Sequence, residues 1–261
     1  MKILHFMDCA GIGALISHEL DNFGIQSHVI QSSSLDPFGF GRYYENTSYY
    51  HHPNEFIGNA EKIMNDQDWI ILHDCPEYLD IFLNSRAKRA VVYHGTRLRN
   101  GFKELRIDEC ADKIFVTMPD LLKYRPNAIP FDRPVDRKLF NDEDRNPNLI
   151  TKLAINRRRD REEIEGYIRR GFPDVTYRIR EDNIIYYGDM PKLLKSYGGY
   201  VDIKFDYSHP INIVPEISIT GLQALACGVT VYDHIYQPIT SFPDKYDSQT
   251  SALKFLSELE S

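Results

Sequence analysis

A histidine follows an apolar run in the segment VVYHGTRLRNG, residues 91–101, and two arginines come shortly after it. His94 therefore stands at the carboxyl end of a predicted strand over 89–95, and ligands of parallel sheets bind at that end of the strands. A neutral imidazole in this place can hydrogen-bond to hydroxyl groups or take part in proton transfer. The alternative is a histidine whose ring nitrogens are hydrogen-bonded by the backbone of its own loop.

A run of arginines follows another predicted strand, in AINRRRDREE, residues 154–163. Arg157 and Arg158 begin a predicted helix over 157–171, and guanidinium groups bind phosphate oxygens through two parallel hydrogen bonds. Cations in the first turn of a helix oppose the helix dipole, so their presence indicates an anionic ligand nearby. A solvated helix start, with arginine–glutamate pairs four residues apart, is the alternative.

Two glycines precede or open a predicted helix in DCAGIGALI, residues 8–16. Gly11 and Gly13 allow backbone amides to approach an anion at the helix N-terminus, where the dipole is positive. A tight structural turn would use the same glycines. A dinucleotide fingerprint also needs a third glycine and an acidic residue at the end of the second strand. Gln31 stands at that end, which disfavours a nicotinamide cofactor.

A second helix start lies in PEISITGLQALACGVTVYD, residues 215–233. Thr220 and Gly221 can present backbone amides and a hydroxyl to an anion at the N-terminus of this helix. Gly228 is predicted to end the helix, because glycine is the preferred residue just past a helix C-terminus. Glu216 lies just before the helix.

Strands and helices alternate along the first half of the chain. Apolar runs predict the strands, and apolar residues at helical spacing predict the helices. The segment 34–56 is rich in Gly, Tyr, His and Asn, and we expect a long loop there, either functional or mobile. The predicted strands are 2–8, 27–33, 68–74, 89–95, 113–118 and 128–131, and the predicted helices are 14–24, 59–66, 76–87, 103–112 and 119–124.

The same alternation returns after a polar, proline-containing segment over 133–148, which is predicted to be a linker. The fold class is therefore predicted as α/β, with two Rossmann-like domains, 1–132 and 149–261, and a small-molecule site in a cleft between them. The predicted strands of the second half are 149–156, 174–180 and 200–206, the predicted helices are 157–171, 190–199 and 251–261, and a helix and a strand lie within 219–233.

The composition is that of an ordinary folded protein, with 42% hydrophobic and 26% charged residues in a chain of 261. The net charge of -7 argues against a nucleic-acid partner, which usually meets a basic surface. No segment has the length and apolar character of a membrane span or a signal peptide. The four cysteines lie far apart and form no CxxC pair, so we expect no metal site and no disulfides, but reduced thiols in the cytoplasm.

Four segments together carry a resemblance to a known family. MKILHFMDCAGIG, VVYHGTRLR, MPDLLKY with IPFDRPVDRKLF, and GLQALACGVTVYD follow one another along the chain. In this they resemble GT-B glycosyltransferases of the GT4-like (glycosyl transferases group 1) family, and the match spans nearly the whole sequence. The resemblance implies two Rossmann-like domains, the second binding a nucleotide-sugar donor such as a UDP- or GDP-sugar.

The resemblance also implies an activity. It implies a hexosyltransferase that moves the sugar to an acceptor hydroxyl with retention of anomeric configuration, without a metal and without a cofactor. The acceptor would be a carbohydrate, a lipid-linked glycan or a protein glycan, and contact with a membrane surface is left open.

The site residues that the resemblance implies fall on both domains. His94 would lie near the reacting sugar on the acceptor side, and Arg157 and Arg158 would neutralise the leaving phosphates. The donor diphosphate would be held at the N-terminus of the helix in 219–233. The residues assigned to the donor and anion contacts are Gly11, Gly13, Asn156, Ile219, Thr220, Gly221 and Gln223, and Glu216 is assigned to catalysis.

Two features depart from the family pattern. Gln223 occupies the position of a glutamate that grips the nucleotide ribose, although its amide can still hydrogen-bond to a hydroxyl. Glu216 is offset by one residue from the other expected glutamate, and the second domain is shorter than usual. These departures leave open a non-catalytic nucleotide-sugar-binding relative, and the architecture leaves open a sugar-nucleotide epimerase or a phosphorylase.

Overall fold

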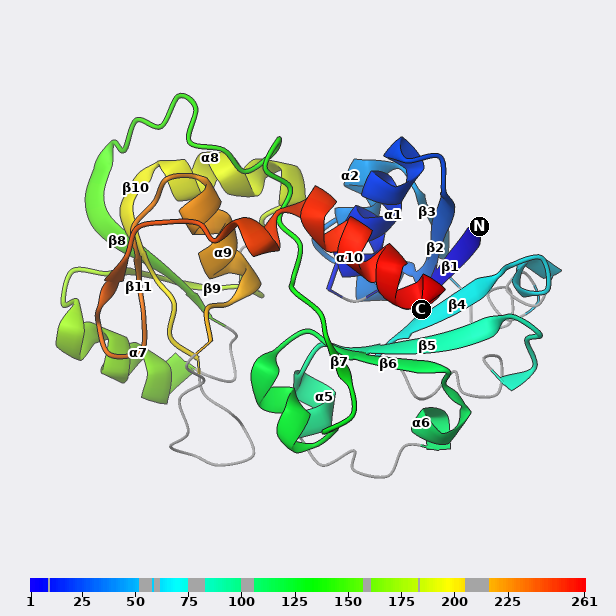
Figure 1. Cartoon of the computed structure of the whole chain (residues 1–261). Coiled ribbons are helices and arrows are strands. Elements are labelled where there is room, and N and C mark those ends of the chain that lie inside the picture. Colours follow the sequence, from blue (N-terminus) through cyan, green and yellow to red (C-terminus); the bar gives the residue numbers. More distant parts are fainter. Residues whose placement is uncertain are drawn as a thin grey trace. The chain divides into compact units, whose positions relative to one another are not determined.

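We analysed a computed structural model of the protein, and the chain divides into two compact units (Figure 1). Unit 1 consists of Met1–Pro134 and Ser248–Ser261, and unit 2 of Val135–Asp247. The residues that the structure describes are 1–8, 10–51, 58, 62–74, 83–99, 106–156, 161–182, 184–204 and 216–261.

Unit 1 is built on a seven-stranded sheet in the order β3-β2-β1-β4-β5-β6-β7, and every neighbouring pair is parallel. The strand order reverses direction between β1 and β4, which makes this the switch point where Rossmann-type sheets bind ligands. The strands are β1 (Lys2–Phe6), β2 (Gln26–Ser32), β3 (Thr47–Tyr50), β4 (Trp69–His73), β5 (Lys88–Tyr93), β6 (Lys113–Val116) and β7 (Ile129–Pro130).

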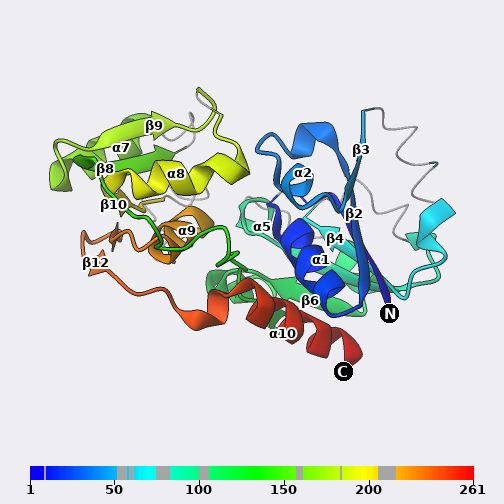
Figure 2. The ribbon, with the colours of Figure 1, turned by 90° about the horizontal axis from the view of Figure 1, so that it is seen from above.

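Helices α1 and α10 come from opposite ends of the sequence and pack together in unit 1 (Figure 2). Ile16 and Leu20 of α1 lie in one buried cluster with Phe255 of α10, because residues three and four apart share one face of a helix. The Phe255 ring lies 5.0 Å from the ring of Phe115 in β6, so α10 helps to cover the sheet. The described helices of unit 1 are α1 (Ile12–Asn22), α2 (Phe40–Tyr44), α5 (Thr96–Arg99), α6 (Arg106–Cys110) and α10 (Ser248–Glu260).

Unit 2 has a five-stranded sheet in the order β12-β11-β10-β8-β9. All neighbouring pairs are parallel except β11 with β12, and the order reverses between β8 and β10. Ile164 and Ile168 of α7 pack against Ala154 and Val201 of the sheet. The elements are β8 (Leu149–Asn156), α7 (Arg161–Gly171), β9 (Thr176–Ile179), α8 (Met190–Lys195), β10 (Tyr197–Val201), α9 (Ile219–Ala226), β11 (Val231–Tyr232) and β12 (Pro238–Ile239).

The predicted fold class, α/β with two Rossmann-like units, is confirmed, and three local predictions are wrong. The segment 34–56, predicted to be a loop, contains α2 and β3, and β3 pairs with β2. The helix predicted over 190–199 ends at Lys195, and Tyr197 already begins β10. Gly198 belongs in a strand here because its backbone lies so close to Ile150 that a Cβ atom would be 2.8 Å from the Ile150 carbonyl oxygen. The sheet of unit 2 is also not purely parallel, since β12 is antiparallel.

The division into units differs from the predicted domain boundaries at two places. The C-terminal helix, predicted to close the second domain, packs in unit 1, because its apolar face completes the cluster around Phe255. The segment predicted as a free linker belongs largely to unit 2. There the Val135 amide donates to the Tyr246 carbonyl, and the Phe140 ring lies 5.4 Å from the ring of Tyr187.

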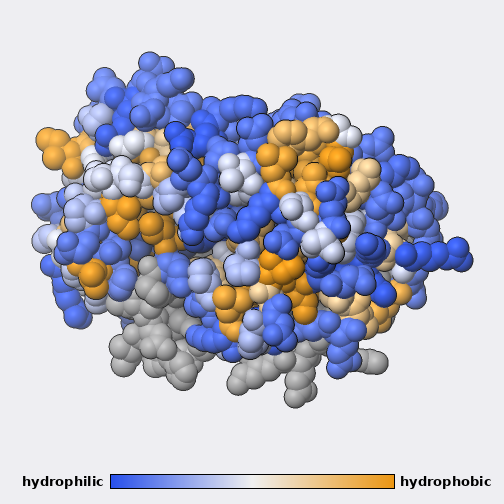
Figure 3. Space-filling view, in the orientation of Figure 1, coloured by the Kyte–Doolittle hydropathy of each residue, from blue (hydrophilic) through white to orange (hydrophobic). Residues whose placement is uncertain are grey.

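On the face seen in Figure 3, hydrophobic residues form several separate groups among hydrophilic ones. Within the described part of the chain, none of the helices combines the length and the apolar character that crossing a bilayer requires.

Candidate functional site

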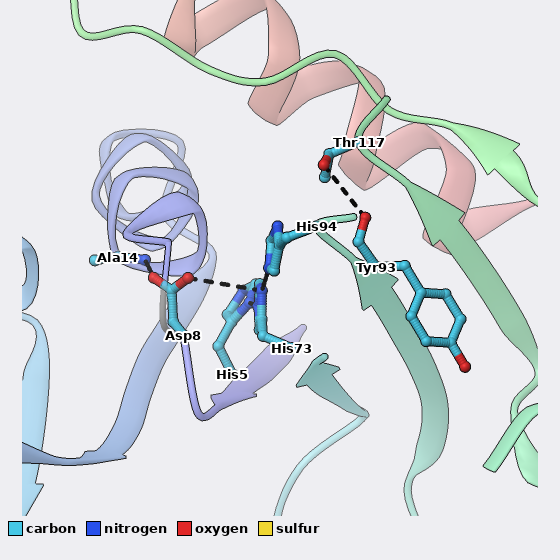
Figure 4. A network of polar contacts seen from close by, with 7 residues as sticks. All are labelled: His5, Asp8, Ala14, His73, Tyr93, His94 and Thr117. Carbon is cyan, nitrogen blue, oxygen red and sulfur yellow. Dashed lines mark hydrogen bonds and ion pairs between the residues drawn. The ribbon is translucent and has the colours of Figure 1, made fainter. Parts of the chain in front are cut away.

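Three polar side chains meet at the switch point of unit 1 (Figure 4). Asp8 follows β1, His73 is the last residue of β4, and His94 follows β5 directly. His73 Nδ1 lies 3.0 Å from His94 Nε2 and 3.7 Å from Asp8 Oδ1. We call Asp8, His73 and His94 the switch-point triad.

A third histidine lies behind the triad. His5 of β1 places its Nδ1 atom 2.9 Å from Nε2 of His73, and both side chains are buried. His73 therefore has a hydrogen-bonding partner on each ring nitrogen and links His5 to His94. The planes of the His73 and His94 rings are only 9° apart.

The carboxylate of Asp8 lies at the N-terminus of α1. Its Oδ2 atom accepts a hydrogen bond of 2.8 Å from the Ala14 amide, whereas Oδ1 has no hydrogen-bond partner among the described residues. The sequence predicts an external anion at this helix start. In the structure a carboxylate of the chain itself takes that place, as the helix dipole favours.

Gly11 and Gly13 have packing roles in this arrangement. Gly11 has a φ of 73°, and a Cβ atom there would lie 2.4 Å from the ring of Phe40. A Cβ atom at Gly13 would lie 2.9 Å from His73 Nε2 and 3.1 Å from His5 Nδ1. The second glycine therefore lets the helix approach the histidines closely.

The backbone beside each triad member is unusual. Met7, directly before Asp8, has a φ of 57°, and Asp74, directly after His73, has a φ of 49°. Gly95, after His94, has a φ of 117°. Left-handed backbone at non-glycine residues is costly and gathers at functional sites, so it supports a functional role for these strand ends.

Burial sets the charge state of the triad. Burial raises the pKa of the Asp8 carboxyl to about 6, against the opposing hydrogen bonds from backbone amides, and the nearby Asp36 carboxylate raises it further. Burial lowers the pKa of His94 to about 4 and places that of His73 well below its usual range. The imidazoles are therefore neutral near pH 7, while the carboxyl is largely ionised.

His94 forms the outer end of the histidine chain. Its Nδ1 atom is buried and has no hydrogen-bond partner in the described part of the chain. A neutral imidazole carries one N–H and one lone pair, so Nδ1 can donate to or accept from a hydroxyl group, depending on the tautomer. The triad also offers two imidazole nitrogens and one carboxylate oxygen, which are atom types that metal ions bind.

The predicted anion site at α9 of unit 2 is partly occupied by the chain itself. Ser218 is the N-cap residue, and its hydroxyl oxygen accepts a hydrogen bond of 3.0 Å from the Gly221 amide. The carboxylate of Asp202 accepts from the Ser218 amide, so a negative charge already lies at this helix N-terminus. Ile219 and Thr220 are half-buried in the first turn. The Gly221 amide is thus engaged within the chain rather than turned to a ligand.

Three other predicted residues lie near the switch point or α9 of unit 2. Asn156 ends β8 and donates from Nδ2 to the Ile203 carbonyl at 3.0 Å, which joins the ends of β8 and β10. Glu216 is half-buried just before α9, and its Oε2 atom has no partner among the described residues. Gln223 is buried within α9, with 5% of its surface exposed. Arg157 and Arg158 lie outside the described residues.

Sequence reasoning identified only one member of the triad. His94 was predicted from its place after a strand, whereas Asp8, His73 and His5 were not singled out. A signal was present, because His5 and His73 are the lone histidines within two otherwise apolar strands, KILHF and WIILH. Such residues are rarely buried without a partner.

Comparison with known proteins gives little beyond this. No protein-family model matches the chain, and no curated protein matches it. Among solved structures, the calicheamicin glycosyltransferase CalG4 superposes with a TM-score of 0.44 and 9% identity, covering 98% of this chain and 84% of that one. The glycosyltransferase of kitacinnamycin superposes with a TM-score of 0.43 and 8% identity, again covering 98% and 84%. The account of the site therefore stands on the geometry described above.

Proposed function

We propose that the protein is a glycosyltransferase of the GT4-like type, which moves a sugar from a nucleoside-diphosphate sugar to an acceptor hydroxyl with retention of configuration. The observation that carries the proposal is the position of His94 at the switch point of unit 1, with Nδ1 free of partners in the described part of the chain. A second unit with its own parallel-strand switch point supports a separate place for a nucleotide.

His94 binds a hydroxyl of the reacting sugar through Nδ1. The other ring nitrogen is hydrogen-bonded to His73, and this contact fixes the orientation of the ring. A neutral imidazole suits the role, because burial disfavours its charged form. Loss of one preorganised hydrogen bond to a reacting group slows enzymes by about 10²-fold or more, which is the effect expected for His94→Ala.

Unit 2 binds the donor. The guanidinium groups of Arg157 and Arg158 take the charge that develops on the diphosphate, so that the reaction proceeds without a metal or a cofactor. The amides of Ile219 and Thr220 add to this at the start of α9. Gly221 drops out of the predicted set, because its amide donates to Ser218.

The remaining donor contacts concern the nucleoside and the sugar. Gln223 binds a ribose hydroxyl through its amide, Glu216 contacts the sugar, and Asn156 lies beside them at the end of β8. The nucleotide is UDP or GDP, and the acceptor is a carbohydrate, a lipid-linked glycan or a protein glycan. The cytoplasm is the proposed compartment, supported by the free thiols of Cys110 and Cys227 in the described chain.

One observation favours a second candidate function. The Asp202 carboxylate at the start of α9 opposes an incoming diphosphate, and Gln223 provides no charge for the ribose. Both features suit a relative that binds a nucleotide-sugar weakly and does not turn it over.

Ligand binding and turnover separate the two candidates. Thermal unfolding is measured with UDP, GDP, ADP, TDP and NAD, and one of the first two should stabilise the protein by about 2.7 kcal/mol at 100-fold excess over Kd. Donor consumption is then followed with and without acceptors and with inorganic phosphate, and the anomeric configuration of the product is read by NMR. Binding without any turnover establishes the non-catalytic relative, and products without acceptor identify an epimerase or a phosphorylase.

Matched variants test the two assigned roles. Arg158→Ala should lower the turnover number by about 10²-fold or more, while Arg169→Ala, which removes an exposed arginine from α7, should not. His94→Ala is compared with His51→Ala, an exposed histidine bonded to Ser33. A chain that binds none of the five nucleotides refutes the proposal.

A further inference from the structure

The switch-point triad has the composition of a metal site. Two imidazoles and one carboxylate bind Zn²⁺ in hydrolytic enzymes, and the same set with open positions binds Fe²⁺ in oxygenases. The three ligand atoms, Asp8 Oδ1, His73 Nδ1 and His94 Nε2, all lie within 4.8 Å of one another. We propose that the switch-point triad binds one divalent transition-metal ion, with Zn²⁺ as the reference ion.

The distances fit an ion with small adjustments. Bonds of about 2.0–2.1 Å in a tetrahedral site place neighbouring ligand atoms about 3.3 Å apart. In the triad, His73 Nδ1 lies 3.0 Å from His94 Nε2 and 3.7 Å from Asp8 Oδ1. Rotations of the side chains that separate the first pair and close the second bring both distances to this value. The fourth position remains for water or a ligand oxygen.

The groups behind the ligand atoms hold them in place. His73 would bind the ion through Nδ1, and its Nε2 atom lies 2.9 Å from His5 Nδ1. Asp8 would bind through Oδ1, and its Oδ2 atom accepts from the Ala14 amide. Supporting hydrogen bonds of this kind orient ligands in established metal sites and fix the histidine tautomer.

The electrostatics of the triad also call for a cation. Asp8 is 1% exposed, and its Oδ1 atom faces His73 without a hydrogen-bond partner in the described chain. The carboxylate of Asp36 adds negative potential at the same place. A buried carboxylate is costly unless it is paired or coordinates a metal, and an ion between Oδ1 and the two nitrogens would compensate it.

A bound ion would change what His94 can do. With Nε2 on the ion, the ring keeps its proton on Nδ1, so that Nδ1 can donate to a hydroxyl but cannot accept from one. This consequence rests on the proposed function, and it makes the ion a modulator of transfer. The binding site itself does not depend on that function.

Metal binding is measured on the untagged full chain after chelator treatment, without nucleotide or sugar. Calorimetry with Zn²⁺ should give one site per chain, and Co²⁺ should give the visible absorption of a tetrahedral nitrogen–oxygen site. Asp8→Ala and His94→Gln should each abolish both signals. His28→Gln, a control on the half-buried β2 histidine bonded to Ser48, should leave them unchanged.

Two further measurements keep the result interpretable. His5→Gln should weaken Zn²⁺ binding by about 10- to 100-fold without changing the stoichiometry, as loss of a supporting hydrogen bond does. In the wild-type chain, Zn²⁺ should shift the ring-nitrogen NMR signals of His73 and His94 and leave those of His28 in place, whether or not a variant folds. Absence of these shifts, or binding that survives Asp8→Ala and His94→Gln, overturns the proposal and leaves a hydrogen-bonded histidine chain.

Discussion

Replacement of Gly13 by alanine tests the packing of α1 on the histidine chain. An alanine in a helix is normally more stable than a glycine by about 1 kcal/mol. At Gly13, however, the added methyl group would lie 2.9 Å from His73 Nε2 and 3.1 Å from His5 Nδ1. Overpacking costs about 1–3 kcal/mol, and a displaced buried hydrogen bond costs about 1–3 kcal/mol more.

We therefore expect Gly13→Ala to destabilise unit 1 by about 2 kcal/mol, which lowers its unfolding midpoint by about 6 °C. The single tryptophan, Trp69, is buried in β4, so its fluorescence reports unfolding of unit 1. Gly166 in α7 is the matched control, because a Cβ atom there meets nothing within 4 Å. Gly166→Ala should stabilise unit 2 by up to about 1 kcal/mol, as followed by circular dichroism.

The two glycine variants should therefore have opposite signs. A Gly13→Ala protein as stable as the wild type would show that α1 does not depend on close approach to His5 and His73. The reasoning about the DCAGIG segment would then be refuted, and the anion-binding explanation of the glycines would regain its place.

Three more outcomes follow from the packing and the caps. Phe255→Ala should cost unit 1 about 3–5 kcal/mol by Trp69 fluorescence, whereas Leu253→Ala, at a residue 46% exposed, should change it by no more than about 0.5 kcal/mol; equal effects would mean that α10 is not part of the core. Ser218→Ala should destabilise unit 2 by about 1 kcal/mol in urea titrations, because the N-cap acceptor of α9 is lost, and an unchanged midpoint would contradict that cap. Asp202→Asn should tighten nucleoside-diphosphate binding about fivefold in calorimetry, since it removes a charge worth about 1 kcal/mol from the helix start; weaker binding would contradict that electrostatic argument.

Most of the sheet was predictable from local pattern alone. β1, β4, β5 and β6 are short apolar runs, and burial on both faces of a parallel sheet selects such runs. β3 was missed because Thr47–Tyr50 is polar and lies at the sheet edge, where no strong apolar pattern is needed. β10 was placed too late because Tyr197–Gly199 continues a helical pattern and contains two glycines.

The candidate site was predictable only in part, for a geometric reason. His94 could be inferred from one strand end, which is a local feature. The contact of His73 with Asp8 depends on β1 and β4 being neighbours, although they lie more than sixty residues apart in the sequence. Gly13 shows the same limit, because a glycine that accommodates a histidine from a distant strand has the same local pattern as one that binds an anion.

The return of the chain from unit 2 to α10 has a consequence for biosynthesis. As the polypeptide leaves the ribosome, every residue of unit 2 has been made before the helix Ser248–Glu260 appears. The sheet of unit 1 must wait for Ala252, Phe255 and Leu259, with the apolar surface that they cover open to chaperones or to other nascent chains. Newly made unit 1 should therefore be the more aggregation-prone half until the last helix has docked.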